Sequence, residues 1–503
     1  MSSYGGSASG ENGDGRSRSE LLAIQYSPEI LTGFALVKRA FDPIGLLNPG
    51  IIVAPAPLSS GLIPIGTTFL GPIESSFSFP DDDAGFVGAA ERCVGIGRCR
   101  SDHGGGMCPS YRATHDEKDS TRGRARALQD MIRGTVITTG WRSMEVLETL
   151  DLCLSCKACA SECPVGVDMA TYKSEFLHHH YRRRLRPRSH YSLGWLPLWT
   201  RLSAAAPSIA NRIMRVEFVR RLLGWAGGIT PLRAMPQFAT RTRRRAARQP
   251  SVSGLPRDVV VLVDTFTAAF RPELVGAATR SLQDAVLTCD TAEGLCCGLT
   301  WISTGQLSRA KRVLSRTIAA LDSDDQVPIV VLEPSCAAAL HKDAPELIGT
   351  DAAHRVSSRI RTFAQVVDEQ LDSGWVAPQV EALGALQVHC HESAVFSSGA
   401  QRRALSRLGC ATIVESEGCC GLAGNFGFER DHYETSMAVA GLALAPLLSS
   451  LYDRSPVLAD GFSCQQQISH LTGVDAEPPL HLAELIDRAL RRRNAQPTDE
   501  ELA

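Results

Sequence analysis

The chain has little net charge, because its 52 lysines and arginines are balanced by 54 aspartates and glutamates, which leaves −2. This balance gives no general reason to expect a nucleic-acid partner. The N-terminus is rich in serine and glycine and lacks the apolar core of a secretory signal. We therefore expect a cytoplasmic protein.

Long uninterrupted apolar segments are also scarce. Residues 43–73 carry no charge, but six prolines lie among them, and four of these interrupt the middle of the segment. Proline removes a backbone donor and breaks helices, so the pattern predicts an extended apolar linker over residues 51–88 instead of a membrane span. We expect a soluble protein that at most docks on a membrane surface. The interrupting residues are Pro49, Pro55, Pro57 and Pro64.

Sixteen cysteines in 503 residues are too few for a disulfide scaffold, and their metal-like spacings indicate a reducing compartment. The run Cys153-x2-Cys156-x2-Cys159-x3-Cys163, followed by proline, is the bacterial iron–sulfur pattern. Electron transfer is therefore the first functional interpretation.

In two-cluster ferredoxins the cysteine before proline reaches across to the other cluster. If the cysteine before proline in each group binds the cluster of the other group, one [4Fe–4S] cluster has a complete set of ligands. These are Cys108, Cys153, Cys156 and Cys159. The second cluster receives only three thiolates, from Cys93, Cys99 and Cys163. Its fourth ligand should stand at position 96, where the chain has Ile96, and His103 is a candidate substitute. We predict that this second cluster is a [3Fe–4S] centre or a labile [4Fe–4S] centre.

The spacing between the cysteines indicates the type of domain that holds them. Helical patterns at 124–132 and 144–152 fill the 44 residues between the two cysteine groups, so we expect a helical ferredoxin domain over 89–180. A basic helical linker should follow at 181–255, with an arginine cluster near each end. These clusters are either solvated helix ends or a docking surface for an acidic partner or anionic lipid. The three histidines at 178–180 are expected on the surface.

Residues 256–490 contain an internal repeat, in which each copy has strands followed by cysteines. Strand patterns at 259–263 and 329–332 recur at 386–389 and 457–459, and helical segments such as 307–321 and 400–408 alternate with them. This alternation predicts two tandem α/β modules with parallel strands, at 256–375 and 383–490, and a tail at 491–503. The fold class is therefore multidomain α/β. The cysteines should converge at the carboxyl edge of each sheet.

The second copy has a complete set of four thiols, from Cys390, Cys419, Cys420 and Cys464. Adjacent cysteines followed by glycine favour metal or cluster binding, because vicinal disulfides are strained and glycine permits close approach of a bulky group. Redox-active thiols and inert packing are the alternatives.

The first copy has only three thiols, from Cys296, Cys297 and Cys336, with Thr265 in the slot that Cys390 fills. The first copy either binds a cluster, or it is a degenerate copy that has lost the site, keeps its fold and pairs with the active second copy. Cys289 is a candidate substitute ligand by proximity alone, and Cys410 is expected to be a small buried hydrophobic residue.

Several motifs together carry a resemblance that covers residues 89–490. They include Gly106-Met107-Cys108-Pro109, the segment 120–125, Glu333-Pro334-Ser335-Cys336, Gly418-Cys419-Cys420-Gly421 and the segment 459–464. On these motifs the chain resembles the iron–sulfur half of fused FAD-linked oxidases with cysteine-cysteine-glycine (CCG) modules. That family includes D-2-hydroxyglutarate and D-lactate dehydrogenase-like enzymes. The chain is also similar to the iron–sulfur subunits of glycolate oxidase and anaerobic glycerol-3-phosphate dehydrogenase, and to heterodisulfide reductase.

The resemblance extends to residues 9–53, which match the end of the family's flavoprotein half. Residues 1–50 are therefore expected to be the remnant of an FAD-linked oxidase domain. Glu11 fits a family metal-ligand position, whereas Asn12 stands where the family has histidine. The family also tends to lack a cysteine at position 96 and to have threonine at 265. The chain alone is expected to bind no FAD.

The resemblance implies an oxidoreductase component that carries electrons for a flavin-linked 2-hydroxy-acid dehydrogenase. FAD would come through a flavoprotein domain or subunit outside this chain, and a quinone or a redox protein would accept the electrons. Two alternatives stay open: a heterodisulfide-reductase-like thiol–disulfide enzyme, and an inactive truncated fragment.

Overall fold

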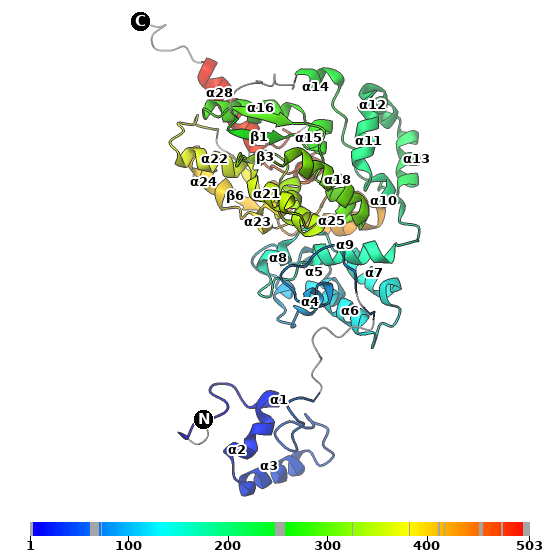
Figure 1. Ribbon diagram of the computed structural model, residues 1–503, viewed down its shortest axis with the longest axis vertical. Helices are drawn as coiled ribbons and strands as arrows, with labels where there is room; N and C mark the ends of the chain where they lie inside the picture. The colour runs from blue at the N-terminus through cyan, green and yellow to red at the C-terminus, as the bar shows by residue number, and fades with distance from the viewer. Residues whose placement is uncertain are drawn as a thin grey trace. The chain divides into compact units, whose positions relative to one another are not determined.

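The computed structural model describes residues 4–60, 70–71, 73–246, 257–323, 325–381, 383–410, 413–416, 418–451, 456–473 and 476–495. The chain divides into two compact units, Met1–Thr67 and Thr68–Ala503 (Figure 1). Among the described residues, no helix is both long and apolar enough to cross a membrane.

The first unit is a small group of helices, α1 (Gly15–Arg18), α2 (Leu22–Gln25) and α3 (Pro28–Phe41). Helix α3 begins with proline in its first turn, where the missing backbone donor costs nothing. None of its residues is buried, and Ile30, Leu36 and Phe41 are exposed. A segment this short cannot bury a large core of its own, so most of its apolar side chains stay partly or fully exposed, whereas Leu22 of α2 is buried.

The second unit begins with a helical layer that carries the first seven cysteines. Its main helices are α4 (Phe86–Glu91), α5 (Pro109–Thr114), α6 (Thr121–Arg133), α7 (Met144–Asp151), α8 (Ala158–Glu162) and α9 (Met169–His180). Ser120 caps α6 by accepting from the Gly123 N–H, and Ser143 caps α7 by accepting from Val146.

Two features of this layer differ from the sequence-based expectation. Phe77 lies within the segment expected to be a linker, yet its ring is only 1% exposed and packs in the core. The histidines at the end of α9 were expected on the surface, and for His180 this is wrong. Its ring is buried, and its Nδ1 lies 2.9 Å from the Trp141 carbonyl oxygen.

Five helices connect this layer to the rest of the unit: α10 (Arg188–Ser192), α11 (Leu196–Ser203), α12 (Pro207–Arg215), α13 (Glu217–Gly227) and α14 (Arg241–Ala246). Helix α13 packs on α10 and α12. It ends at Gly228, whose left-handed conformation (φ +70°) suits glycine.

Two small parallel sheets form the remainder, which confirms the α/β class. The first has strands β1 (Val259–Leu262), β2 (Cys289–Ala292), β3 (Ile329–Val331) and β4 (Ile360–Thr362) in the order β2-β1-β3-β4. The second has β5 (Ala385–Gln387), β6 (Val414–Ser416) and β7 (Val457–Leu458) in the order β6-β5-β7. All the pairings are parallel; for example Val260 is opposite Ile329, and Ala385 is opposite Val414.

Both sheets share one arrangement, in which the first strand is central and the next two lie on either side of it. The strand order therefore reverses beside β1 and beside β5, where open α/β sheets form their binding crevices. We call the first sheet with its surrounding helices the first lobe, and the second sheet with its helices the second lobe. The two lobes share a core. Helix α16 (Glu273–Asp284) packs on α28 (Leu482–Ala495), and α22 (Phe363–Asp372) packs on α24 (Gly399–Arg407).

Candidate metal centres

The first candidate centre is a cavity lined by four buried thiols from the helical layer. They come from the start of α5 and from the segment that leads into α8, and they are Cys108, Cys153, Cys156 and Cys159. This is the set that the crossed-ligand pattern predicts for one cluster. Four thiols around one enclosed space match the donor set that a cubane iron–sulfur cluster requires.

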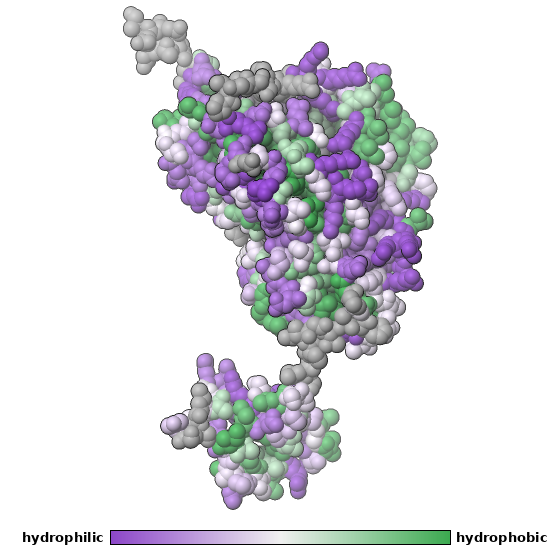
Figure 2. Space-filling view, in the orientation of Figure 1, coloured by the Kyte–Doolittle hydropathy of each residue, from purple (hydrophilic) through white to green (hydrophobic). Residues whose placement is uncertain are grey.

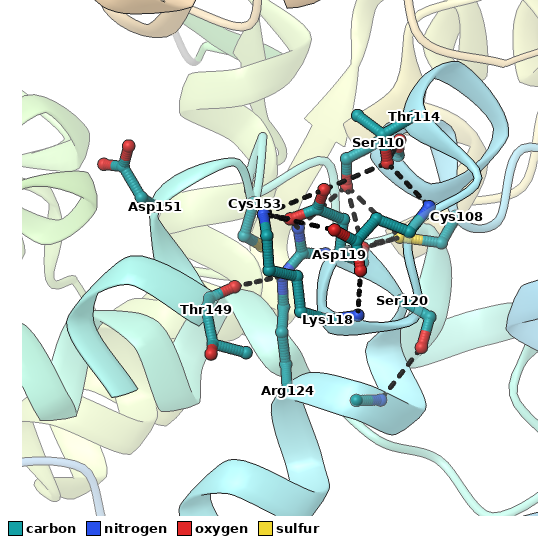
Figure 3. Close-up of polar contacts among 12 residues, drawn as sticks. Cys108, Ser110, Thr114, Lys118, Asp119, Ser120, Arg124, Thr149, Asp151 and Cys153 are labelled. Atoms are coloured by element: carbon teal, nitrogen blue, oxygen red, sulfur yellow. Dashed lines mark hydrogen bonds and ion pairs between the residues drawn. The ribbon is translucent and has the colours of Figure 1, made fainter. Parts of the chain in front are cut away.

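A buried arginine stands beside this cavity (Figure 3). The Arg124 side chain is 1% exposed. Its Nη1 donates to Cys108 Sγ at 3.5 Å, its Nη2 to Ser110 Oγ at 3.0 Å and its Nε to the Thr149 carbonyl at 3.0 Å. Burial opposes ionisation of Cys108, but the charge of Arg124 and the hydrogen bond from Ser110 outweigh it, and the pKa of Cys108 is lowered.

The second candidate centre brings together Cys93, Cys99 and Cys163. Burial raises the pKa of Cys93, and the neighbouring Cys163 raises it further. The backbone N–H of Arg122 donates to Cys99 Sγ at 3.3 Å. Ile96 is 57% exposed, and the side chain of His103 is also exposed. The structure thus provides three thiols here, while the two residues considered for the fourth position face solvent.

A buried ion group joins the helical layer to the first α/β lobe. Lys157 Nζ lies 2.9 Å from Asp168 Oδ2 and 2.9 Å from Asp343 Oδ1. Asp343 belongs to the first lobe, and Lys157 stands between two predicted cluster ligands. Burial opposes the charge of Lys157, but the two carboxylates raise its pKa above the usual value.

In the second lobe the four predicted thiols form a hydrogen-bonded chain. Cys419 contacts both Cys390 and Cys420, and Cys420 contacts Cys464. These contacts lower the pKa of Cys420 well below its usual value. A Cβ at Gly421, which has φ +88°, would lie 2.2 Å from the Ser436 carbonyl oxygen, so only glycine fits beside the pair.

The first lobe repeats this arrangement with one replacement. Cys297 Sγ lies 2.9 Å from Cys336 Sγ, and Cys296 contacts Cys297. The Thr265 hydroxyl hydrogen bonds with Cys296 and so occupies the fourth place. The three thiols and the hydroxyl all follow the carboxyl ends of β1, β2 and β3.

The two remaining cysteines lie elsewhere. Cys289 begins β2 and therefore lies at the opposite end of the sheet from the thiol set, so the structure does not bring this candidate substitute to the site. Burial raises the pKa of Cys289 to about 12. Cys410 is 6% exposed and packs in the core shared by the two lobes.

One carboxylate lies between the thiol sets of the two lobes. Glu333 Oε2 accepts from the Phe462 N–H at 2.7 Å, and Glu333 Oε1 accepts from the Ser335 hydroxyl at 2.6 Å. Burial and the neighbouring Asp264 raise the pKa of Glu333 to about 7. Glu333 is close enough to raise the pKa of both Cys336 and Cys464.

The first candidate centre also touches the second lobe. Burial raises the pKa of Cys156 well above its usual value, and the nearby Cys390 raises it further. The His391 Nε2–H donates to the Ser155 carbonyl at 3.0 Å. A cavity of 260 Å³ lies at this junction, with Cys156, Cys390 and Cys419 in its wall.

Three of these side chains were missed by the sequence analysis. Arg124, Lys157 and Glu333 lie in or near the quoted motifs, but neither charge nor spacing marks a residue whose partner is distant in sequence. Asp343, for example, lies 186 positions after Lys157.

Comparison with protein families matches three segments. The 4Fe-4S dicluster domain family matches residues 89–167, the cysteine-rich domain family matches residues 268–341, and the family of FAD linked oxidases, C-terminal domain, matches residues 1–52.

Curated relatives agree with this combination. D-2-hydroxyglutarate dehydrogenase of Pseudomonas putida is 28% identical over 95% of this chain and 51% of its own length. The glycolate oxidase iron-sulfur subunit of Escherichia coli is 22% identical over 80% of this chain and 94% of its own. The glycolate oxidase subunit GlcD of the same organism is 52% identical over 46 residues.

The chain spans about half the length of the D-2-hydroxyglutarate dehydrogenases that it matches. No solved structure matches it significantly. Segments that match the C-terminal domain of FAD linked oxidases, a 4Fe-4S dicluster domain and a cysteine-rich domain occur in this order, and in this combination the chain is similar to fused FAD-linked oxidase and iron–sulfur proteins.

Proposed function

We propose that this chain is the iron–sulfur electron-transfer part of a flavin-linked 2-hydroxy-acid dehydrogenase. The observation that carries the proposal is that Cys156 of the helical layer and Cys390 of the second lobe line the same cavity. Two buried thiol sets that meet in this way suit electron exchange between neighbouring centres. The relatives are named D-2-hydroxyglutarate dehydrogenase and glycolate oxidase iron-sulfur subunit, and these names support 2-hydroxy acids as the substrate class.

The proposed ligands are the thiol sets described above. Cys108, Cys153, Cys156 and Cys159 would hold a [4Fe–4S] cluster, and Cys93, Cys99 and Cys163 a [3Fe–4S] or labile [4Fe–4S] cluster. Bound clusters would supply single-electron chemistry, whose potential depends on burial and on hydrogen bonds to sulfur. The chain contributes both, because it buries the first set and directs the Arg124 guanidinium at Cys108.

We further propose that the two lobes are tandem CCG modules, at 256–375 and 383–490. Their common strand order supports this, as do the equivalent positions of the cysteine pairs after β2 and β6. The second module, with four thiols, would be the working redox site, and the first mainly its scaffold. Thr265 in the fourth position of the first module is a poor ligand for iron in comparison with a thiolate.

The partners follow from the same proposal. Residues 1–52 match the C-terminal domain of FAD linked oxidases. The remainder of such a flavoprotein domain would lie in the same polypeptide or in a separate subunit, and that part would carry FAD. A quinone or a redox protein would accept the electrons, and peripheral attachment to a membrane would place the chain near such an acceptor.

The test is analysis of iron, sulfide and flavin in the anaerobically purified chain. We expect iron and sulfide with no stoichiometric flavin. Cys156→Ser should remove iron and abolish electron transfer, because it deletes one of four thiolates. The matched control Cys410→Ser should cost only packing energy, about 1 kcal/mol. Equal iron loss in the two variants, or stoichiometric flavin, would contradict the proposal.

A second function is favoured by one observation. The 260 Å³ cavity beside Cys390 and Cys419 offers space for a small substrate, as a heterodisulfide-type thiol–disulfide reductase would need. If the isolated chain reduces a disulfide substrate and Cys419→Ser abolishes this activity, the result would support a thiol–disulfide reductase over an electron-transfer protein.

A further inference from the structure

The helices that follow the helical layer have a charge unlike that of the whole chain. Residues 181–246 contain fifteen arginines and one acidic residue, Glu217, although the protein as a whole carries −2. Glu217 is itself paired with Arg221 at 2.6 Å. This part of the surface is therefore strongly positive.

The same helices expose apolar side chains in a regular pattern. Ile209, Ile213 and Val216 follow one another at intervals of four and three residues along and just after α12. On α13, Phe218, Leu222 and Trp225 are exposed at intervals of four and three residues in the same way. Residues at these intervals lie on one face of a helix.

We define the α11–α13 face by its nine exposed apolar residues, whose exposed fractions run from 45% to 75%. Figure 2 shows the corresponding hydrophobic area where Figure 1 labels α12 and α13. The face consists of Trp199, Leu202, Ile209, Ile213, Val216, Phe218, Leu222, Leu223 and Trp225.

This face is not explained by packing within the described part of the chain. None of the residues of α13 is buried, and Pro207 is the only buried residue of α12. A contiguous apolar patch of this kind normally marks a site of interaction.

We propose that the α11–α13 face docks on the surface of an anionic lipid bilayer. Amphipathic helices with tryptophan, phenylalanine and leucine on one face and arginines beside it lie in the membrane interface. Arg212 and Arg215 of α12 and Arg220 of α13 would meet the negative headgroups. Arg188, whose guanidinium lies 4.7 Å from the centre of the Trp225 ring, adds a further cation beside an interfacial aromatic residue.

The helices are too short to span a bilayer, so the attachment would be peripheral. The positive charge favours a lipid surface over an uncharged apolar partner, because anionic headgroups satisfy the arginines while the acyl region accepts the apolar side chains. The proposal depends on this surface alone and is independent of the redox chemistry proposed above.

The test is co-sedimentation of the full chain with vesicles of phosphatidylcholine, alone or mixed with phosphatidylglycerol. We expect binding to the mixed vesicles that is at least about 10-fold tighter than binding to the neutral ones, since each basic residue near the surface contributes about fivefold. High salt should weaken this preference.

Two sets of variants separate the apolar and charged contributions. Phe218→Glu with Leu222→Glu should abolish binding, whereas the control pair Val286→Glu with Val376→Glu, at sites 87% and 84% exposed outside the face, should bind as the unmodified chain does. Arg212→Gln with Arg215→Gln should remove most of the anionic preference. This pair leaves the apolar residues intact and keeps the test valid if the glutamate pair misfolds.

Equal binding to neutral and anionic vesicles, or no binding to either, would overturn the proposal. Two other occupants would also overturn it. One is a second copy of the chain, shown by self-association that Phe218→Glu with Leu222→Glu removes in sedimentation velocity. The other is the flavoprotein part, shown if the same pair blocks its association while vesicle binding is absent.

Discussion

A buried arginine that donates to a predicted ligand distinguishes the first candidate centre. Arg124 is enclosed next to Cys108, with its remaining donors directed at Ser110 and the Thr149 carbonyl. A reduced iron–sulfur cluster is more negative than an oxidised one, so a fixed positive charge and an N–H donor to sulfur favour reduction. Arg124 is therefore expected to raise the reduction potential of the cluster that Cys108 would hold.

Arg124→Gln should lower that potential by about 65–130 mV, which for a one-electron couple corresponds to the roughly 1.5–3 kcal/mol of a hydrogen bond to a charged group. A potentiometric titration followed by electron paramagnetic resonance measures the shift. Arg126→Gln is the matched control, because its side chain is exposed and pairs with Asp130 one turn along the same helix. An unchanged potential in Arg124→Gln, with iron retained, would contradict the expected role.

The second candidate centre has its own prediction, which rests on Ile96. Because only three thiols meet there, the oxidised protein should show the paramagnetic resonance signal of a [3Fe–4S] centre. Ile96→Cys should abolish that signal by supplying a fourth thiolate. Two stable [4Fe–4S] spectra from the unmodified chain would show that another group fills the position.

At the residue scale, the spacing of the cysteines placed Cys108 with Cys153, Cys156 and Cys159, and these four side chains line one cavity. Their role as ligands of one cluster stays a prediction. Spacing could not identify the buried charges around them. Arg124 and Lys157 look like ordinary solvated residues in the sequence, and only the tertiary fold removes them from water and sets them beside their partners.

At the scale of elements, the two sheets have the same strand order, but their thiol sets differ by one group. Thr265 stands at the end of β1 where Cys390 stands at the end of β5. Glu333 lies between the two sets and influences both. The arrangement places one complete and one incomplete site in neighbouring positions.

Cys419→Ser or Cys420→Ser should therefore stop delivery of electrons to the acceptor, while the clusters of the helical layer still become reduced. Cys297→Ser should weaken delivery less, because its module lacks a full set of thiolates. Steady-state acceptor reduction with the flavoprotein part restored, together with spectroscopy of the reduced clusters, measures both effects. The reverse ranking would assign the chemistry to the incomplete module.

The regular elements were predicted well where their patterns were long. The helical segments expected at 144–152 and 307–321 match α7 and α18 (Leu307–Leu321) to within one residue. The pattern failed where burial depends on distant contacts. Phe77 lies in a stretch without regular structure, yet the Glu175 carboxylate accepts hydrogen bonds from Ser76 and Phe77 and fixes this stretch against α9.

At the scale of the whole second unit, polar contacts join the helical layer to both lobes. Lys157 reaches Asp343 of the first lobe, and His391 of the second lobe reaches the Ser155 carbonyl. A third contact joins His432 of the second lobe to Asp151 at the end of α7, with Nε2 2.9 Å from Oδ2. These contacts hold the thiol sets next to one another.

The His432 contact makes the stability of this junction depend on pH. Burial opposes its charge, but Asp151 and Glu429 outweigh burial and raise the pKa of His432 to about 9, above its ordinary value of 6.5. These two carboxylates lie 2.9 Å and 3.2 Å from its ring nitrogens, and Phe426 stacks on its ring. A raised pKa in the folded state means that the stabilisation is complete below pH 6.5 and is lost as the pH rises through about 9.

We therefore expect the free energy of unfolding to fall by about 1–3 kcal/mol between pH of about 6 and about 10 through this group. His432→Gln should remove that part of the pH dependence and destabilise the protein at the acidic end, because Asp151 and Glu429 lose their cation. Anaerobic urea denaturation at both pH values, with the exposed His354→Gln as the control, measures the difference. If the unmodified chain and His432→Gln lost stability in parallel across this range, the pH dependence would arise from other groups, and the ion pair would contribute little to holding the helical layer against the second lobe.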